Sequence, residues 1–103
     1  KEIPVGGTLT STIGRHPTSR QKMEINVRNG KEAITHYRTL EKFPMLSLVE
    51  CSLETGRTHQ IRVHLSRMLN APILNDPQYG SPSRDRNILD NHKGHRIHPC
   101  IAL

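Results

Sequence analysis

Aromatic residues are scarce in this chain of 103 residues, which has no tryptophan. The aromatic side chains are Tyr37, Phe43 and Tyr79. Such side chains supply much of the apolar area that a domain buries, and a chain of this length fits one small domain with a thin core. We therefore expect a face that packs on something outside the chain. The shortage also argues against binding of single-stranded RNA by aromatic stacking.

Cysteine and long apolar runs are scarce as well. The two cysteines, Cys51 and Cys100, make no disulfide framework and fit a reducing compartment. No apolar run approaches the roughly 20 residues that span a bilayer. We expect a cytoplasmic protein in which Cys51 is a small core residue.

The charge is unbalanced towards the basic side. Fifteen lysines and arginines against nine acidic residues give a net charge of +6, before seven histidines are counted. This excess favours a polyanionic partner, although a basic surface that serves only solubility is the alternative. The chain starts Lys1-Glu2-Ile3 and stops in the apolar run Ile101-Ala102-Leu103, so we expect both ends to be cut from a longer protein.

The pattern of apolar residues predicts an α+β domain, mainly an antiparallel sheet with one central amphipathic helix. Short alternating runs predict strands over residues 3–13, 23–27, 33–40, 46–53 and 96–103, the first interrupted by Gly6-Gly7. Turns are expected at 14–17, 29–30 and 43–44, so that residues 8–28 form a hairpin. The polar stretch 81–93 is expected to be a loop.

The helix is predicted over residues 59–69, after a Thr-Gly turn. Its apolar stripe is expected to be Ile61, Leu65, Met68 and Leu69. Thr58 or Thr55 is the expected cap at its start, and Asn70 with Pro72 is expected to end it. On such a helix His59, Arg62 and Ser66 share one face, beside the apolar stripe.

The same stretch carries the most specific motif. Residues 55–65 read T-G-R-T-H-Q-I-R-V-H-L. This run resembles the T-G-R-x-H-Q-[IL]-R-V-H signature of the RluA-type pseudouridine synthases, RNA-modifying enzymes that isomerise uridine in place. The segments 14–17, 20–23 and 30–37 also look like the branch of that family that acts on large-subunit ribosomal RNA.

The resemblance implies roles for particular residues. The family uses one catalytic aspartate, in an H-R-L-D-x-x-T-S-G segment, without metal or nucleotide cofactor. The position of Arg62 is that of the arginine that pairs with this carboxylate, and a guanidinium there keeps an aspartate ionised and oriented. Ile61 matches a position that walls the base pocket. The other expected substrate contacts are Arg57, which binds phosphate or braces the turn, and His59, Arg15, Arg20 and Lys22.

The chain also departs from the family pattern. It contains no H-R-L-D segment, and the aspartates after the motif, Asp76, Asp85 and Asp90, lie in turn-like contexts. Asp76 matches the family's G-D-x-x-Y-G turn and is expected to cap it, whereas 98–100 departs from the family's L-H-A. We expect residues 1–103 to be the C-terminal portion of a catalytic domain, inactive alone. The expected partners are RNA and the missing N-terminal half of the domain.

The sequence allows three other interpretations. His92, His95, His98 and Cys100 suggest a metal site, but their spacing matches no common zinc pattern. A small RNA-binding module without catalysis would use the basic residues Arg15, Arg20, Lys22 and Arg28 alone. A basic piece of a ribosomal protein fits the composition but leaves the motif unexplained. An H-R-L-D-like segment upstream of Lys1 would decide for the enzyme.

Overall fold

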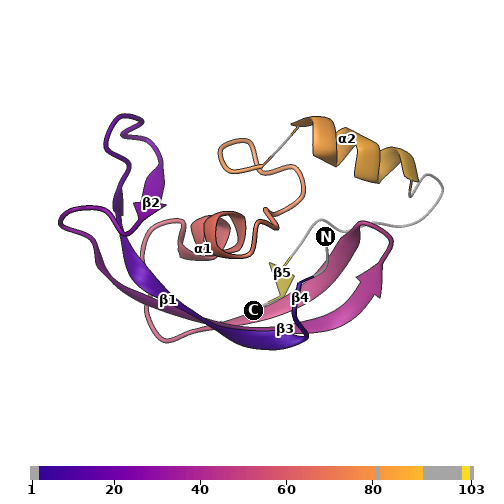
Figure 1. Cartoon of the computed structure of the whole chain (residues 1–103), viewed down its shortest axis with the longest axis horizontal. Helices are drawn as coiled ribbons and strands as arrows, with labels where there is room; N and C mark the ends of the chain where they lie inside the picture. Colours follow the sequence, from indigo (N-terminus) through magenta and orange to yellow (C-terminus); the bar gives the residue numbers. More distant parts are fainter. Residues whose placement is uncertain (1–2, 81, 92–100, 103) are drawn as a thin grey trace.

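A computed structural model describes residues 3–80, 82–91 and 101–102. A curved five-stranded sheet in the order β2-β1-β3-β4-β5 holds helix α1 against its concave face (Figure 1). The first four strands pair antiparallel, and β5 joins β4 in parallel. The elements are β1 Gly6–Arg15, β2 Met23–Ile25, β3 Lys31–Phe43, β4 Leu46–Leu53, α1 Gln60–Met68, α2 Pro82–Asn91 and β5 Ile101–Ala102. The predicted α+β class is confirmed.

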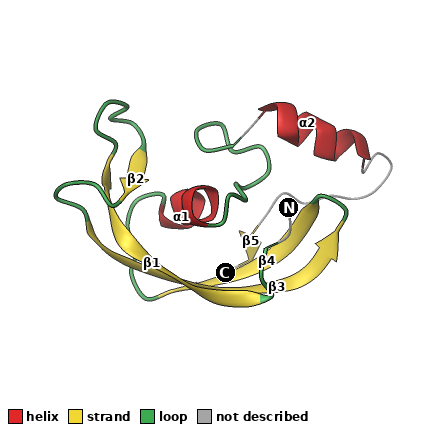
Figure 2. Cartoon of the chain, viewed as in Figure 1, coloured by secondary structure: helices red, strands yellow, loops and turns green. Residues whose placement is uncertain are grey.

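The sheet buries one face because its strands alternate. Leu9 and Ile13 of β1 are buried, as are Tyr37 of β3 and Cys51 of β4, and Tyr37 lies opposite Cys51 in the β3–β4 register. Figure 2 shows the second face without a helix over it among the described residues. That face carries polar side chains, and the ion pair between Arg38 and Glu50 is one example.

The core consists of two apolar clusters along the concave face. One is built from Ile3, Leu9, Tyr37, Val49, Cys51 and Leu65, and the other from Ile13, Met23, Ala33, Val63 and Tyr79. Ser11 and Thr35 lie between the two clusters, since each strand alternates through them on the same face. His64, fully buried on α1, bonds to both, with Nε2 2.9 Å from Ser11 Oγ and Nδ1 2.7 Å from Thr35 Oγ1. A polar bridge thus fixes α1 at one height along the sheet.

This bridge predicts a pH dependence of stability. Burial lowers the pKa of His64, so the unfolded chain takes up a proton first as the pH falls below about 6.5. Stability should be unaffected above that pH and should fall below it, by at most about 1.4 kcal/mol per pH unit, until the folded pKa is reached. We expect urea unfolding between pH 7.5 and 5.5 to show a smaller loss for His64→Gln than for the unaltered chain. Equal losses of stability in the two proteins would show that His64 does not cause the pH dependence.

Several boundaries differ from the prediction. The first strand begins at Gly6 and continues through Gly14 and Arg15, which were expected to form a turn. Gly14 and Arg15 belong to the strand because they pair with Glu24 and Met23 of β2. Glycine suits position 14, since a Cβ there would lie 2.8 Å from Val27 Cγ2. β3 is longer than predicted and ends at Phe43. The strand at 46–53 is confirmed.

The stretch predicted to be a loop over 81–93 contains helix α2 instead. Pro82 suits a first helical turn, which needs no N–H there, and Asp85 in that turn complements the helix dipole. The side chain of Asp85 also accepts a hydrogen bond from the backbone N–H of Asn75 at 3.0 Å. Of the strand predicted over 96–103, Ile101–Ala102 is a strand, and 96–100 and 103 lie outside the described residues.

Helix α1 was placed correctly, and three of the four residues predicted for its apolar stripe face the core, since Leu65 is buried and Ile61 and Leu69 pack against the first cluster. The residues it buries are Gln60, Val63, His64 and Leu65, whereas Met68 is 38% exposed. The prediction wrongly included Met68 and missed Gln60 and His64, because a count of apolar residues leaves out polar residues that take core positions. In the part of the chain that the structure describes, no helix is long and apolar enough to cross a membrane.

Candidate functional site

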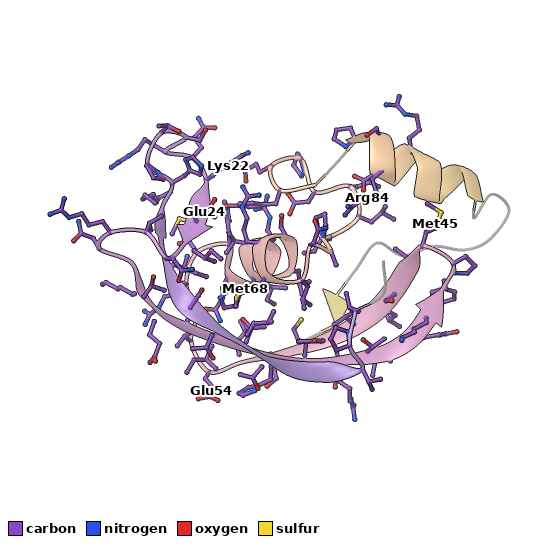
Figure 3. The ribbon with its side chains drawn as sticks, in the orientation of Figure 1. Lys22, Glu24, Met45, Glu54, Met68 and Arg84 are labelled. Atoms are coloured by element: carbon purple, nitrogen blue, oxygen red, sulfur yellow. The ribbon has the colours of Figure 1, made fainter. Side chains whose placement is uncertain are left out.

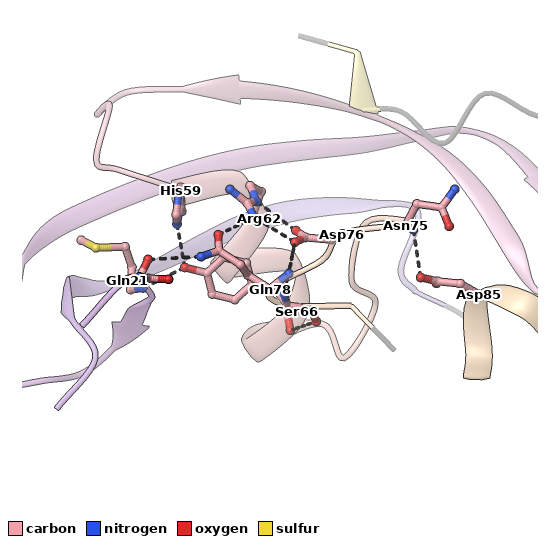
Figure 4. A network of polar contacts seen from close by, with 10 residues as sticks. Gln21, His59, Arg62, Ser66, Asn75, Asp76, Gln78 and Asp85 are labelled. Carbon is pink, nitrogen blue, oxygen red and sulfur yellow. Dashed lines mark hydrogen bonds and ion pairs between the residues drawn. The ribbon is translucent and has the colours of Figure 1, made fainter. Parts of the chain in front are cut away.

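The site is built around an ion pair between Arg62 of α1 and Asp76 (Figure 4). Arg62 donates from Nε to Asp76 Oδ2 at 3.0 Å and from Nη2 to Oδ1 at 2.9 Å, and Nη2 also donates to Gln78 Oε1 at 2.8 Å. The side chain of Asp76 is 2% exposed and that of Arg62 is 29% exposed. Two parallel hydrogen bonds fix the plane of the guanidinium.

Asp76 also caps the turn formed by residues 76–80. Its Oδ1 accepts hydrogen bonds from the backbone N–H groups of Gln78 and Tyr79, at 2.9 and 3.1 Å. Burial alone would raise the pKa of Asp76, but the bonds from Arg62 and from these two N–H groups outweigh it and lower the pKa. Gly80 closes the turn, since a Cβ there would lie 2.5 Å from Asp76 O. The expectation that Asp76 caps this turn is therefore confirmed.

Tyr79 lies under the predicted helix face and contacts each of its three residues. The Arg62 guanidinium carbon lies 5.0 Å from the centre of the Tyr79 ring, a cation–π contact. His59 Nδ1 lies 2.8 Å from the Tyr79 hydroxyl, and Ser66 Oγ donates to Tyr79 O at 3.1 Å. The hydroxyl also accepts a hydrogen bond from the backbone N–H of Met23 at 2.7 Å.

His59 begins α1 in the left-handed region, at φ 57° and ψ 22°, and its side chain does not cap the helix. Burial lowers the pKa of His59, and the charges of Arg62 and Arg15 act in the same direction, against Asp76. His59 is therefore neutral near pH 7. The predicted cap at Thr58 or Thr55 was wrong, because the side chain that joins the Thr-Gly turn to the start of the helix belongs to a later residue.

That side chain is the buried Gln60. Its Nε2 donates to Ile34 O at 3.0 Å and to Thr35 Oγ1 at 2.9 Å. Its Oε1 accepts from Thr55 Oγ1 at 2.7 Å and from the backbone N–H of Arg57 at 2.9 Å. One amide thus joins the strand β3, the Thr-Gly turn and the helix start.

Two of the residues predicted to contact substrate also make contacts that stabilise the fold. Arg57 donates from Nε to Glu32 O at 2.8 Å, which braces the turn against β3. Ile61 is partly buried and packs against the first apolar cluster. These contacts are compatible with further contacts to a ligand.

The predicted basic residues Arg15, Arg20 and Lys22 lie at the end of β1 and on the segment that joins it to β2, and residues 15–22 are called here the basic loop. Arg15 and Arg20 are exposed and Lys22 is half-buried, and Arg15 Nη1 donates to Arg20 O at 3.3 Å. The ring Nδ1 of His16 accepts from the backbone N–H groups of Thr18 and Ser19 at 3.2 and 3.0 Å. In Figure 3, Lys22 lies on the arm made by this loop and Glu54 lies on the opposite, convex side of the sheet.

Sequence reasoning missed Gln60, Gln78 and Tyr79. The available signals were the glutamine inside the motif and the tyrosine in the turn that follows it. Among the described residues, no group of three or more His, Cys, Asp or Glu side chains is placed to hold a metal ion. The residues of the metal interpretation, in 92–100, lie outside the described part, as does the side chain of Asp90.

The family follows from comparison with known proteins. The family model described as RNA pseudouridylate synthase matches residues 1–67. The chain therefore belongs to the RNA pseudouridylate synthase family, and the resemblance found in its motif is confirmed.

Individual relatives agree with this assignment. The chain is 54% identical over 84 residues to the protein named ribosomal large subunit pseudouridine synthase D of Nitrosomonas europaea, covering 82% of this chain and 24% of that protein. It is 51% identical over 74 residues to the protein of Bacillus subtilis named uncharacterized RNA pseudouridine synthase YlyB, covering 72% and 24%. The chain thus spans about a quarter of the length of these relatives.

Solved structures share the fold. Human RNA pseudouridylate synthase domain containing 1 matches with a TM-score of 0.68 and 28% identity, over 84% of this chain and 39% of that one. Human RNA pseudouridylate synthase domain containing 4 matches with a TM-score of 0.58 and 35% identity, over 79% and 34%.

Proposed function

We propose that this chain is part of an RNA pseudouridine synthase that isomerises uridine to pseudouridine in RNA, with large-subunit ribosomal RNA as the substrate. The observation that carries the proposal is the held guanidinium of Arg62 within the T-G-R-T-H-Q-I-R motif. The names of the relatives support the substrate, since several are ribosomal large subunit synthases. In this proposal residues 1–103 form the C-terminal portion of the catalytic domain, and the enzyme is cytoplasmic.

Arg62 acts as the partner of a catalytic aspartate that the other portion of the domain supplies. Asp76 and Gln78 occupy Nε and Nη2, and Nη1 makes no hydrogen bond to any described residue. Nη1 is the atom that we assign to the catalytic carboxylate. A positive charge there lowers the pKa of that carboxyl group and keeps it ionised, as its attack on a flipped uracil requires. Because Asp76 holds the other edge, the guanidinium is oriented before the substrate arrives.

The substrate contacts follow from position and chemistry. Ile61, next to Arg62 on the helix, is the apolar wall of the base pocket. His59 contacts substrate beside it, and its ring is held there by the hydrogen bond between Nδ1 and the hydroxyl of Tyr79. Arg57 combines its brace to β3 with a phosphate contact. Arg15, Arg20 and Lys22 bind RNA phosphates, which position the enzyme on its substrate without reading sequence. The remaining partner is the N-terminal half of the domain, and no cofactor takes part.

The phosphate contacts predict a salt dependence. Phosphate contacts release counterions, so RNA affinity should fall by about 0.7–0.9 log units per log unit of salt for each contact. We expect Arg20→Gln with Lys22→Gln to weaken binding to all RNAs and to flatten that slope. Arg38→Gln is the control, because it removes one positive charge from the convex face. Filter binding over a salt series measures the slopes. Equal slopes for the unaltered chain, the double variant and Arg38→Gln would show that the basic loop is a solvated surface that does not contact phosphate.

A further inference from the structure

We propose that the hydroxyl of Tyr79 is a positioning group that joins the basic loop to His59 and Arg62, so that RNA phosphates and the groups beside the reacting base are placed together. The inference rests on the proposed function and adds a residue to it. It arises from a contact between distant parts of the chain, because Met23 and Tyr79 are 56 residues apart.

The first link ties Tyr79 to the basic loop. Met23 directly follows Lys22, and its backbone N–H donates to the Tyr79 hydroxyl at 2.7 Å. Both side chains are buried, at 8% and 5% exposure, so water cannot readily replace this bond. The adjacent Gln78 Nε2 makes a longer contact of 3.4 Å to Gln21 O. The end of the basic loop is therefore attached to the turn that carries Asp76.

The second link ties the same hydroxyl to His59. A tyrosine hydroxyl has one proton to donate, and its oxygen already accepts from Met23. We infer that it donates this proton to Nδ1 of His59, 2.8 Å away, because the hydroxyl then uses both its proton and its oxygen. Nδ1 is then an acceptor and the ring proton is on Nε2, which becomes a donor for an oxygen of the substrate. The two rings meet edge to face, with centres 5.6 Å apart and planes at 79°.

The third link is through the ring to Arg62. The guanidinium lies over the ring at 5.0 Å, while Asp76 and Gln78 hold it from the turn. Within the turn of residues 76–80, Asp76 and Gln78 thus bind the edge of the Arg62 guanidinium, and the Tyr79 ring lies against its face. A shift of the basic loop on RNA binding moves Met23, and through the hydroxyl of Tyr79 it moves His59 and the turn that orients Arg62.

Tyr79→Phe separates these links, since it removes the hydroxyl and keeps the ring under Arg62. We expect NMR of the 103-residue chain to show His59 with Nδ1 unprotonated, and the Met23 amide protected from hydrogen exchange. In Tyr79→Phe, exchange at Met23 should rise about tenfold or more, and His59 should become a mixture of tautomers. The amides of Gln78 and Tyr79, which donate to Asp76, should change little. Tyr37→Phe, in the other apolar cluster, is the control and should leave Met23 and His59 unchanged.

A short RNA hairpin then tests the coupling. In the unaltered chain it should shift the signals of the basic loop together with the side-chain signals of His59 and Arg62, and in Tyr79→Phe the loop alone. Equal shifts of His59 and Arg62 in both proteins would overturn the inference, as would a His59 protonated at Nδ1. If the unaltered chain binds no RNA, the phosphate contacts proposed for the basic loop fail, whereas exchange at Met23 and the tautomer of His59 still decide the inference. These two signals of the unaltered chain also decide it if the variant does not fold.

Discussion

Replacing Arg62 with alanine is expected to slow the chemical step of pseudouridine formation about 10²–10³-fold, the usual effect of removing one positioned group from a charged transition state. Without the guanidinium, the catalytic aspartate loses its countercharge and its pKa rises, so less of it is ionised. The protein to measure is a chimera in which this chain replaces the matching segment of the Nitrosomonas europaea relative. Single-turnover rates at saturating enzyme report the chemical step alone.

Three further variants define that result. Arg62→Lys keeps the charge but loses the planar pair of donors, so its rate should lie between those of the unaltered protein and Arg62→Ala. Arg67→Ala is the control on the same helix, since Arg67 is more exposed and pairs with Glu24 at 3.1 Å. Asp76→Asn keeps an oxygen for the turn but removes the charge that holds Arg62, so it should slow the reaction less than Arg62→Ala. If Arg62→Ala weakens RNA binding and keeps the single-turnover rate, Arg62 is a substrate contact instead.

Arg62→Ala also leaves the carboxylate of Asp76 without its cation, in a place where 2% of that side chain is exposed. Two backbone N–H groups still bind it, so we expect a loss of about 1–3 kcal/mol in stability. Rates should therefore be compared at a temperature where circular dichroism shows every variant folded.

The second large effect concerns the chain by itself. The purified 103-residue chain should release no tritium above background from RNA labelled at C5 of uridine. The reason is that its sequence contains no H-R-L-D segment, and Asp76, the aspartate beside Arg62, is already bound to Arg62 and to its own turn. Asp76 cannot attack a base without giving up both. Turnover by the chain alone would show that one of its own residues performs the reaction.

Much of the fold could be predicted from local patterns. The strand at 46–53 and the helix start near residue 60 have strong periodicity and a turn between them, so both were predicted within one or two residues. The class of protein was predicted from ten consecutive motif positions. These features depend on residues that are close in sequence.

The errors came from features that depend on distant residues. The end of β1 at Gly14 and Arg15 depends on its pairing with β2. Helix α2 has few apolar residues, so its polar composition resembled a loop. The burial of Gln60 and His64 depends on hydroxyl groups of β1 and β3 that form hydrogen bonds with them. Pattern analysis reads such polar residues as solvent-facing.

The candidate site shows the same division. Arg62 and its neighbours on the helix face were predicted from the motif and from helical spacing. The contacts of Tyr79 with Met23, His59 and Arg62 join three separate parts of the chain, and no local pattern contains them. The structure alone brings them together.

The measurement that tests the central claim most directly is tritium release by the chimera that carries the unaltered chain. The claim is that this chain supplies the arginine portion of a pseudouridine synthase site whose acidic portion lies in another segment. We predict release by the chimera within about tenfold of the relative's own rate, since a folded and oriented site retains most of its transition-state stabilisation. A chimera that folds and binds RNA but releases no tritium would contradict the claim.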